Sequence, residues 1–179
     1  TRILCVTMGW IRSSAVASVT IDGNPTTIIS APVVTSGTTN IGTAIAYLKY
    51  GIGTSATITI TMATSANTVM NFEVHSVYSG SSTIQDTLAI SSTAIADISG
   101  SLDVTASGGS IAIAVSETSS NPFTWSGISE HQDRAAGGTL FRFSDAHENS
   151  IINTATITIS ADTGVSDVKS LTSISFAPF

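Results

Sequence analysis

The segment Ala56-Thr57-Ile58-Thr59-Ile60-Thr61-Met62 indicates a β fold, because apolar and hydroxyl side chains alternate along it without interruption. In a β-strand this alternation sends Ile58, Ile60 and Met62 to one face and the threonines to the other. A closely similar pattern returns at Ala155-Thr156-Ile157-Thr158-Ile159-Ser160. Both segments therefore predict strands with one apolar face and one polar face.

The rest of the chain continues this pattern. Ile, Val and Thr supply 61 of the 179 residues, and β-branched side chains favour strands over helices. The best helix candidate, 93–98, is short. Further strands are expected at about 3–8, 16–21, 43–50, 69–78, 87–91, 102–106, 110–116, 122–126, 139–143 and 170–177, separated by turn residues as at 22–25 and 162–164. We therefore predict an all-β chain, an antiparallel, jelly-roll-like β-sandwich with residues 1–179 in one domain.

The charge and hydropathy of the sequence argue against direct nucleic-acid binding and against a membrane span. Charged residues make up 10% of the chain and the net charge is −6, which argues against direct binding to a phosphate backbone. No apolar run approaches the ~18 residues of a membrane span, and the first residues lack the apolar segment of a secretory signal. The single cysteine, Cys5, lies in an apolar alternation and is expected to be a buried, inert thiol.

The segment Ser110-Ile111-Ala112-Ile113-Ala114-Val115 alternates large and small apolar residues. The large side chains are expected to enter the core. Ala112 and Ala114 then allow close approach of a second sheet, a loop or a neighbouring subunit, which makes them candidate contact residues. The alternative is a central strand that the chain itself covers on both sides.

Two polar clusters interrupt the apolar pattern, Glu130-His131-Gln132-Asp133-Arg134 and Asp145-Ala146-His147-Glu148-Asn149. Imidazoles and carboxylates of this kind serve in metal and acid–base sites. Their spacing, however, matches no metal or catalytic motif. We interpret them as solvated loops or subunit contacts, with Glu130, His131, Asp133 and Arg134 as contact candidates, and we predict no catalytic residue, metal ligand or cofactor. His75 is expected to be a partly exposed cross-strand partner.

Several segments together resemble small β-sandwich structural proteins of tailed bacteriophages. They are Ala17-Ser18-Val19-Thr20-Ile21-Asp22-Gly23, Ala46-Tyr47-Leu48-Lys49-Tyr50-Gly51-Ile52-Gly53-Thr54, Phe123-Thr124-Trp125-Ser126-Gly127 and Ser173-Ile174-Ser175-Phe176-Ala177-Pro178-Phe179. The resemblance covers most of the chain and rests on strand and turn patterns. Gly51-Ile52-Gly53 stands where such proteins often carry Val-Pro before a Gly-Thr turn, and no functional residue carries over.

The resemblance implies a non-enzymatic virion component, such as a capsid decoration or a tail or fibre module. It would bind neighbouring virion proteins and copies of itself, while the charge and the apolar run lengths described above predict no direct binding to nucleic acid or membrane. Phe179 either contacts such a neighbour or docks into its own domain. Two rival hypotheses are a glycan-binding receptor module that uses Trp10 and Tyr47 against a host surface glycan, and a hydrolase that uses the region of His131 and His147.

Overall fold

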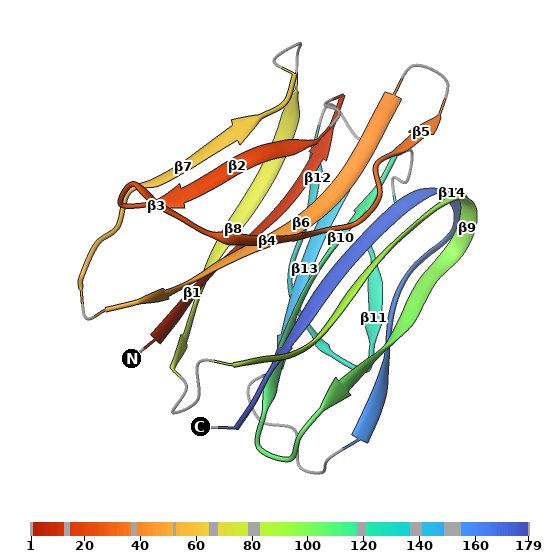
Figure 1. Cartoon of the computed structure of the whole chain (residues 1–179). Coiled ribbons are helices and arrows are strands. Elements are labelled where there is room, and N and C mark those ends of the chain that lie inside the picture. Colours follow the sequence, from red (N-terminus) through yellow and green to blue (C-terminus); the bar gives the residue numbers. More distant parts are fainter. Residues whose placement is uncertain are drawn as a thin grey trace.

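The fold consists of antiparallel strands. The structure is a computed structural model of the chain, and it describes residues 2–12, 15–36, 39–51, 53–64, 68–78, 83–117, 121–136, 141–148 and 155–178. The strands are β1 (Arg2–Ile11), β2 (Val16–Ile21), β3 (Asn24–Pro25), β4 (Thr27–Ser30), β5 (Val34–Ser36), β6 (Thr39–Tyr50), β7 (Ile58–Met62), β8 (Val69–Tyr78), β9 (Ile84–Val104), β10 (Gly109–Ser116), β11 (Thr124–Ser126), β12 (Ser129–Ala136), β13 (Phe141–Glu148) and β14 (Ala155–Phe176) (Figure 1).

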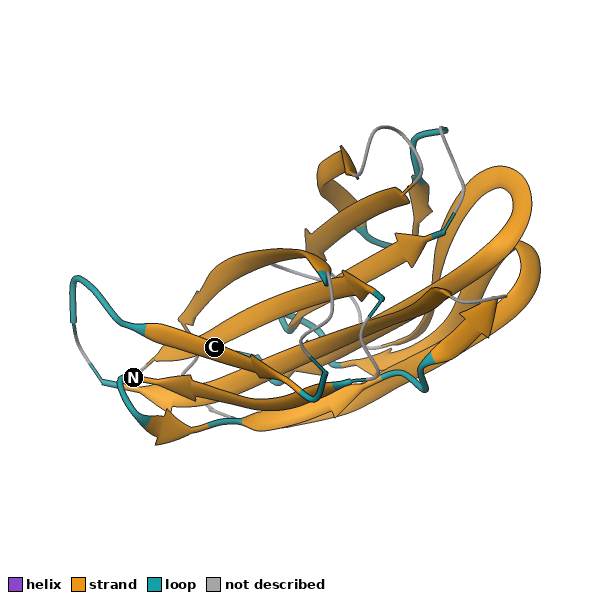
Figure 2. Ribbon diagram, turned by 90° about the horizontal axis from the view of Figure 1, so that it is seen from above, coloured by secondary structure: helices purple, strands orange, loops and turns teal. Residues whose placement is uncertain are grey.

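Every strand pair in these ranges is antiparallel. Figure 2 shows strands and connecting loops throughout the described residues, with no helix. The predicted all-β antiparallel class is confirmed. None of the described segments forms a helix with the length and apolarity needed to cross a membrane.

The sheet that we call sheet A is built on β1, which is apolar on both faces. Its strand order is β4-β6-β1-β8, and β5 also pairs with β6. Leu4 and Val6 point to one side of β1, whereas Ile3 and Cys5 point to the other, and all four are buried. A strand of this kind needs cover on both faces. Sheet A therefore lies inside a stack of sheets, and the expectation that Cys5 is buried is confirmed.

Sheet B, with the order β3-β2-β7, covers one face of sheet A. Ile58, Ile60 and Met62 of β7 turn inward and pack against the cluster that contains Val6 and Met8 of β1. The intervening threonines of β7 are exposed. The alternation of apolar and hydroxyl residues along β7 thus corresponds to one buried face and one solvent-exposed face.

Sheet C covers the opposite face of sheet A, with the order β11-β14-β10-β13-β12 and β9 pairing with β14. Two apolar clusters fill the space between sheets A and C. Hydroxyl groups enter this space as well: Thr43 Oγ1 lies 2.8 Å from both Ser170 Oγ and Thr172 Oγ1. Because these buried hydroxyls satisfy one another, the sheets can pack closely around them.

The strands β9 and β14 form a long ribbon that folds back over the outer face of sheet C (Figure 1). The register between them shifts after Asp162, and Gly164 adopts a positive φ of 69° at this bend. The folded-back halves contribute Leu102 and Ile159 to a core that also contains Ala112 and Ala114 of β10. The ribbon thus buries the second face of sheet C.

A buried lysine holds the bend of this ribbon. Lys169 is fully buried, and its Nζ donates hydrogen bonds to the carbonyl oxygens of Ile95 (2.6 Å) and Val165 (2.7 Å). It also forms an ion pair with Asp167, whose other carboxylate oxygen accepts a 2.6 Å hydrogen bond from Ser116 Oγ. One ammonium group thereby connects β9 to both sides of the bend in β14.

Several predicted elements differ from the observed ones. The short helix candidate 93–98 lies within β9, because this segment pairs with β14. The segment 162–164 bends a continuous strand and does not close a hairpin, and the predicted polar loop 130–134 is part of β12. Two pairs of predicted strands are each one strand, 87–91 with 102–106 in β9, and 155–160 with 170–177 in β14.

Candidate functional site

All three histidines of the chain meet at the side of the molecule where β8 lies across β12 and β13. On β8, alternate residues point toward sheet C, and His75 is one of them, because it shares the inward face with Val77. On β13, Asp145 and His147 point to the same side of the strand as Phe143, which is the side that faces sheet A. The two-residue alternation of side chains on β8 and β13 therefore brings His75, Asp145 and His147 into the space between the strands.

Asp145 is the centre of this cluster. Its side chain is 1% exposed, and its Oδ2 atom lies 3.1 Å from Nδ1 of His131 and 3.4 Å from Nε2 of His75. His131 is the extra residue of a β-bulge in β12, since the register with β13 shifts between Glu130 and Gln132. Bulges redirect side chains, and here the bulge brings the His131 imidazole to the buried carboxylate.

His147 completes the group. Its ring centroid lies 5.0 Å from that of His131 and 5.8 Å from that of His75, while the rings of His75 and His131 are 5.9 Å apart. The His147 Nδ1 atom and the Asp145 Oδ1 atom are buried without a hydrogen-bond partner among the described residues. Three imidazoles therefore share the neighbourhood of a single buried carboxylate.

The surroundings disfavour a positive charge on His147. Partial burial lowers the pKa of His147 from its ordinary value, and the neighbouring His75 and His131 lower it further when they are charged. Asp145 and Glu148 oppose this shift with smaller effects. At neutral pH the cluster can thus hold a neutral imidazole at His147.

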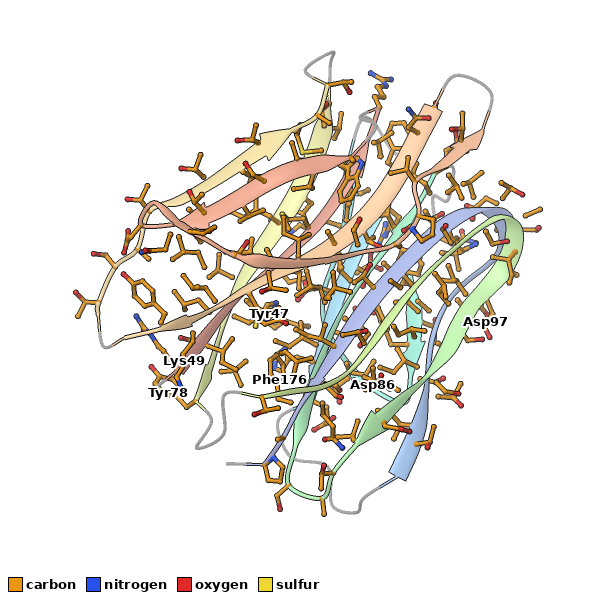
Figure 3. All side chains as sticks on the ribbon, viewed as in Figure 1. Tyr47, Lys49, Tyr78, Asp86, Asp97 and Phe176 are labelled. Carbon is orange, nitrogen blue, oxygen red and sulfur yellow. The ribbon has the colours of Figure 1, made fainter. Side chains whose placement is uncertain are left out.

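A pocket of about 500 Å³ opens beside the cluster, and all three imidazoles line it. Ser76, Ser110 and Glu148 add polar groups to its wall, and Tyr78 and Phe176 add aromatic ones (both labelled in Figure 3). The pocket combines hydrogen-bonding groups with aromatic surface, which is the composition of many ligand sites.

Two other charged side chains of β12, Asp133 and Arg134, have partners inside the chain. Asp133 accepts hydrogen bonds from Arg142 Nε (2.5 Å) and Nη2 (3.1 Å), as well as from the backbone N–H of Phe123 (2.8 Å). Arg134 lies 3.3 Å from Glu73 on β8 and is half exposed. Glu130 is largely exposed, but neighbouring atoms remove part of the water around its carboxyl group, which raises its pKa. Repulsion from Asp133 adds to this effect. These contacts join β12 to its neighbours.

Ala112 and Ala114 face the interior of the chain, which corrects the prediction that they contact another subunit. Both are 0% exposed, because the folded-back halves of β9 and β14 cover them. On the other face of β10, Ile111 and Ile113 pack toward sheet A. The alternative of a central strand covered on both sides is the one observed.

The predicted glycan platform is also corrected. Trp10 is fully buried between sheets A and B, where its indole ring packs so closely on Gly42 that an added Cβ would lie 2.4 Å from it. Tyr47 is half-buried beside Phe176 and packs on the cluster between sheets A and C (Figure 3). Trp10 offers no face to a sugar. Phe179 lies outside the described residues.

The outer face of β8 is a feature that the sequence analysis did not identify. Phe72, Val74 and Tyr78 are 50%, 45% and 65% exposed and point away from sheet C. They account for three of the four exposed large hydrophobic residues of the described chain, Val165 being the fourth. The signal was present in the sequence, because residues 69–78 carry apolar side chains at both parities.

The chemistry of the cluster is set by its donors and acceptors. Among the described residues, no hydroxyl or thiol is hydrogen-bonded to any of the three imidazoles, and no three His, Cys, Asp or Glu side chains are arranged to hold a metal ion. Cys5 lies opposite His75 in the register between β1 and β8, but burial raises the pKa of its thiol and so disfavours the thiolate.

Comparisons of the chain with family models, curated proteins and solved structures found no match.

Proposed function

We propose that this chain is a non-enzymatic structural protein of a bacteriophage particle, a capsid decoration or tail-associated module that binds neighbouring virion proteins and copies of itself. The observation that carries the proposal is the exposed apolar face of β8, formed by Phe72, Val74 and Tyr78. Scattered apolar residues are normal on a protein surface, whereas a contiguous group on an edge strand is typical of a contact with another chain.

The composition of the surface supports the same proposal. Few ions and many hydroxyl groups lie on the outer strands, as in β7, where threonines alternate with the inward-facing Ile and Met residues. Packing such a surface against protein desolvates few charges, and desolvating a charge is costly. We infer further that sheets A and C form the two layers of a jelly-roll-like β-sandwich, to which sheet B and the folded ribbon are additions.

Labelling of purified particles tests the proposal. Antibodies against the folded chain are applied to density-purified phage particles and to the particle-free fraction of the same lysate. We expect multiple copies per particle, at a regular position on the head or the tail. A chain that occurs only in the particle-free fraction would contradict the proposal.

Matched variants connect the binding to β8. We expect the double variant Phe72→Ser/Val74→Ser to lose at least about tenfold in affinity for particles stripped of the chain, because each apolar side chain that is buried in a contact is worth roughly 1.5–3 kcal/mol. Val165→Ser, which removes the one large exposed apolar side chain that the described residues carry outside β8, is the control and should bind normally. Equal affinity of the two variants would exclude β8 as the contact.

The pocket beside the histidines favours a second candidate function, a glycan-binding module of a tail or head fibre. Its wall offers imidazole, hydroxyl and carboxylate groups next to the exposed Tyr78, and sugars are held by such hydrogen-bonding groups beside aromatic rings. This location replaces the predicted platform at Trp10.

A glycan array with the wild-type chain and two variants tests this candidate. Saturable binding that is lost in Glu148→Gln but kept in Phe72→Ser, whose side chain is not part of the pocket wall, would support a site in the pocket. An array without any bound saccharide would reject the glycan candidate and leave the β8 proposal unaffected.

A further inference from the structure

The strand β8 has one free edge. It ends the strand order of sheet A, pairing with β1 along ten residues from Val69 to Tyr78, and no other described strand pairs with it. Such an edge presents backbone N–H and C=O groups to another strand. The neighbouring edge strand β12 carries charges and a bulge, which hinder pairing, whereas β8 contains no Lys, Arg or Pro.

We propose that two copies of the chain pair antiparallel through β8, with Val74 of one copy opposite Val74 of the other. This inference rests on the proposed function, because it names a second copy as one partner of the β8 face. A two-fold axis between identical antiparallel strands stands perpendicular to the sheet. In such a pair, residues that stand directly opposite each other point to the same face of the sheet. Because side chains alternate between the two faces along each strand, the axis must place one residue opposite its own copy.

The register centred on Val74 makes both faces of the joined strands complementary. On the outer face, Val74 meets Val74, so these two exposed apolar side chains cover each other, and Phe72 stands opposite the small side chain of Ser76 of the other copy. On the inner face, Glu73, which lies 3.3 Å from Arg134 of its own chain, stands opposite His75 of the other copy, which lies 3.4 Å from its own Asp145. Symmetry creates this cross-strand pair twice, in addition to the contacts within each chain. A carboxylate opposite an imidazole is a favourable cross-strand pair.

The neighbouring registers lack this complementarity. Centring on Glu73 places two carboxylates opposite each other, and like charges in that position are unfavourable. Centring on His75 places two imidazoles opposite each other and pairs Glu73 with the apolar Val77. The register at Val74 alone among these three gives both carboxylates an imidazole partner. Sheet A would then continue without a break through the two copies.

Site-specific cross-linking tests both the interface and its register. Residues directly opposite in an antiparallel pair have Cβ atoms about 4.5–5.5 Å apart, within reach of a short bismaleimide cross-linker. We expect Val74→Cys to form a covalent dimer by itself, and Phe72→Cys mixed with Ser76→Cys to form a heterodimer. The wild-type chain serves as the background control, since its only cysteine, Cys5, is buried.

Val165→Cys is the control for random collisions, because its side chain is exposed and lies on β14, which belongs to a different sheet from β8. A heterodimer of Val74→Cys with Ser76→Cys would overturn the register and favour the one centred on His75. Absence of any covalent dimer in the β8 variants, at concentrations up to about 1 mM where even weak complexes form, would overturn the inference. Circular dichroism confirms that each variant is folded.

The two proposals fail separately. If antibodies label phage particles but the β8 cysteine variants form no cross-links, the symmetric pair is contradicted and the virion proposal stands. Covalent β8 dimers from a chain that never occurs in particles would contradict the virion proposal and leave the symmetric pair intact.

Discussion

The buried carboxylate of Asp145 organises the residues around it. It is almost completely removed from solvent, yet two imidazoles approach the same oxygen atom. A charge in such a position needs partners, because desolvation of an unpaired carboxylate is costly. His75 and His131 supply these partners from different sheets, so the cluster also connects the edge of sheet A to sheet C.

The lowered pKa of His147 predicts that the protein loses stability in mild acid. The unfolded chain takes up a proton at the ordinary histidine pKa of about 6.5, whereas the folded chain takes it up only at a lower pH. Between these two values the unfolded state binds more protons, so the free energy of unfolding decreases as the pH falls. Urea unfolding between about pH 8 and pH 5.5 should show this decrease.

His147→Gln provides the comparison, because glutamine keeps hydrogen-bonding groups but does not titrate in this range. Its free energy of unfolding should depend less on pH than that of the wild-type chain. Identical pH dependence in the two proteins would show that His147 is not the responsible group.

Gly9 is required for the close approach of sheets A and C. A Cβ atom at this position would lie 2.4 Å from Val115 Cγ2 and 2.8 Å from Phe143 Cδ1, which are side chains of the facing sheet. We expect Gly9→Ala to destabilise the fold by about 1–3 kcal/mol, as overpacked cores do. Denaturant unfolding measures this value.

Gly51→Ala is the matched control. A Cβ atom at Gly51 meets nothing within 4 Å, so we expect a change within about 0.5 kcal/mol. Equal effects of the two substitutions would mean that the sheets do not approach as closely at Gly9 as described.

Part of the site was predictable at this scale. The sequence singled out His131, Asp145 and His147 because they interrupt an apolar pattern. It did not predict that His75 would join them, since this depends on how β8 lies across sheet C. The burial of Trp10 is likewise a property of the sheet stacking, because nothing in the residues next to Trp10 distinguishes a covered strand from an exposed one.

At the scale of elements, the β9–β14 ribbon depends on one buried ion pair. Lys169 and Asp167 are both buried, and the lysine also holds two backbone carbonyl groups at the bend. We expect Lys169→Met to lower the free energy of unfolding by roughly 3–5 kcal/mol, because it removes the ammonium group of a buried ion pair.

The double variant Lys169→Met/Asp167→Asn should recover part of this loss, since it removes the second charge as well. Lys49→Met, at the exposed lysine of β6, should change stability by less than about 0.5 kcal/mol. A loss at Lys169 no larger than that at Lys49 would contradict the buried arrangement. Denaturant unfolding of the three variants decides between these results.

The elements could be predicted where alternation was strong. The bounds 16–21 and 69–78 agree with β2 and β8, and 110–116 agrees with β10 to within one residue. The prediction was wrong where turn-forming residues lie inside a continuous strand, as at Gly164 in β14. It was also wrong for β12, because an edge strand can form without an apolar face and therefore resembles a polar loop in the sequence.

At the scale of the whole molecule, the sheets form a stack whose inner strands are covered and whose edges remain available. The strands β1 and β10 are buried on both faces. The strands β8 and β12 are the edges of sheets A and C on the side of the histidine cluster. This asymmetry between β8, with its apolar outer face, and the charged β12 makes β8 the place where another chain is expected to bind.

Hydrogen exchange measured at increasing protein concentration shows whether β8 is the strand at which another chain binds. In dilute solution the amides of β1 and β10 should exchange slowly and those of β8 and β12 faster, because edge strands leave half of their amides unpaired. As the concentration rises, we predict that protection increases in residues 69–78 and stays unchanged in residues 129–136. Protection of β8 that does not change with concentration, in a chain that self-associates elsewhere or not at all, would contradict the account.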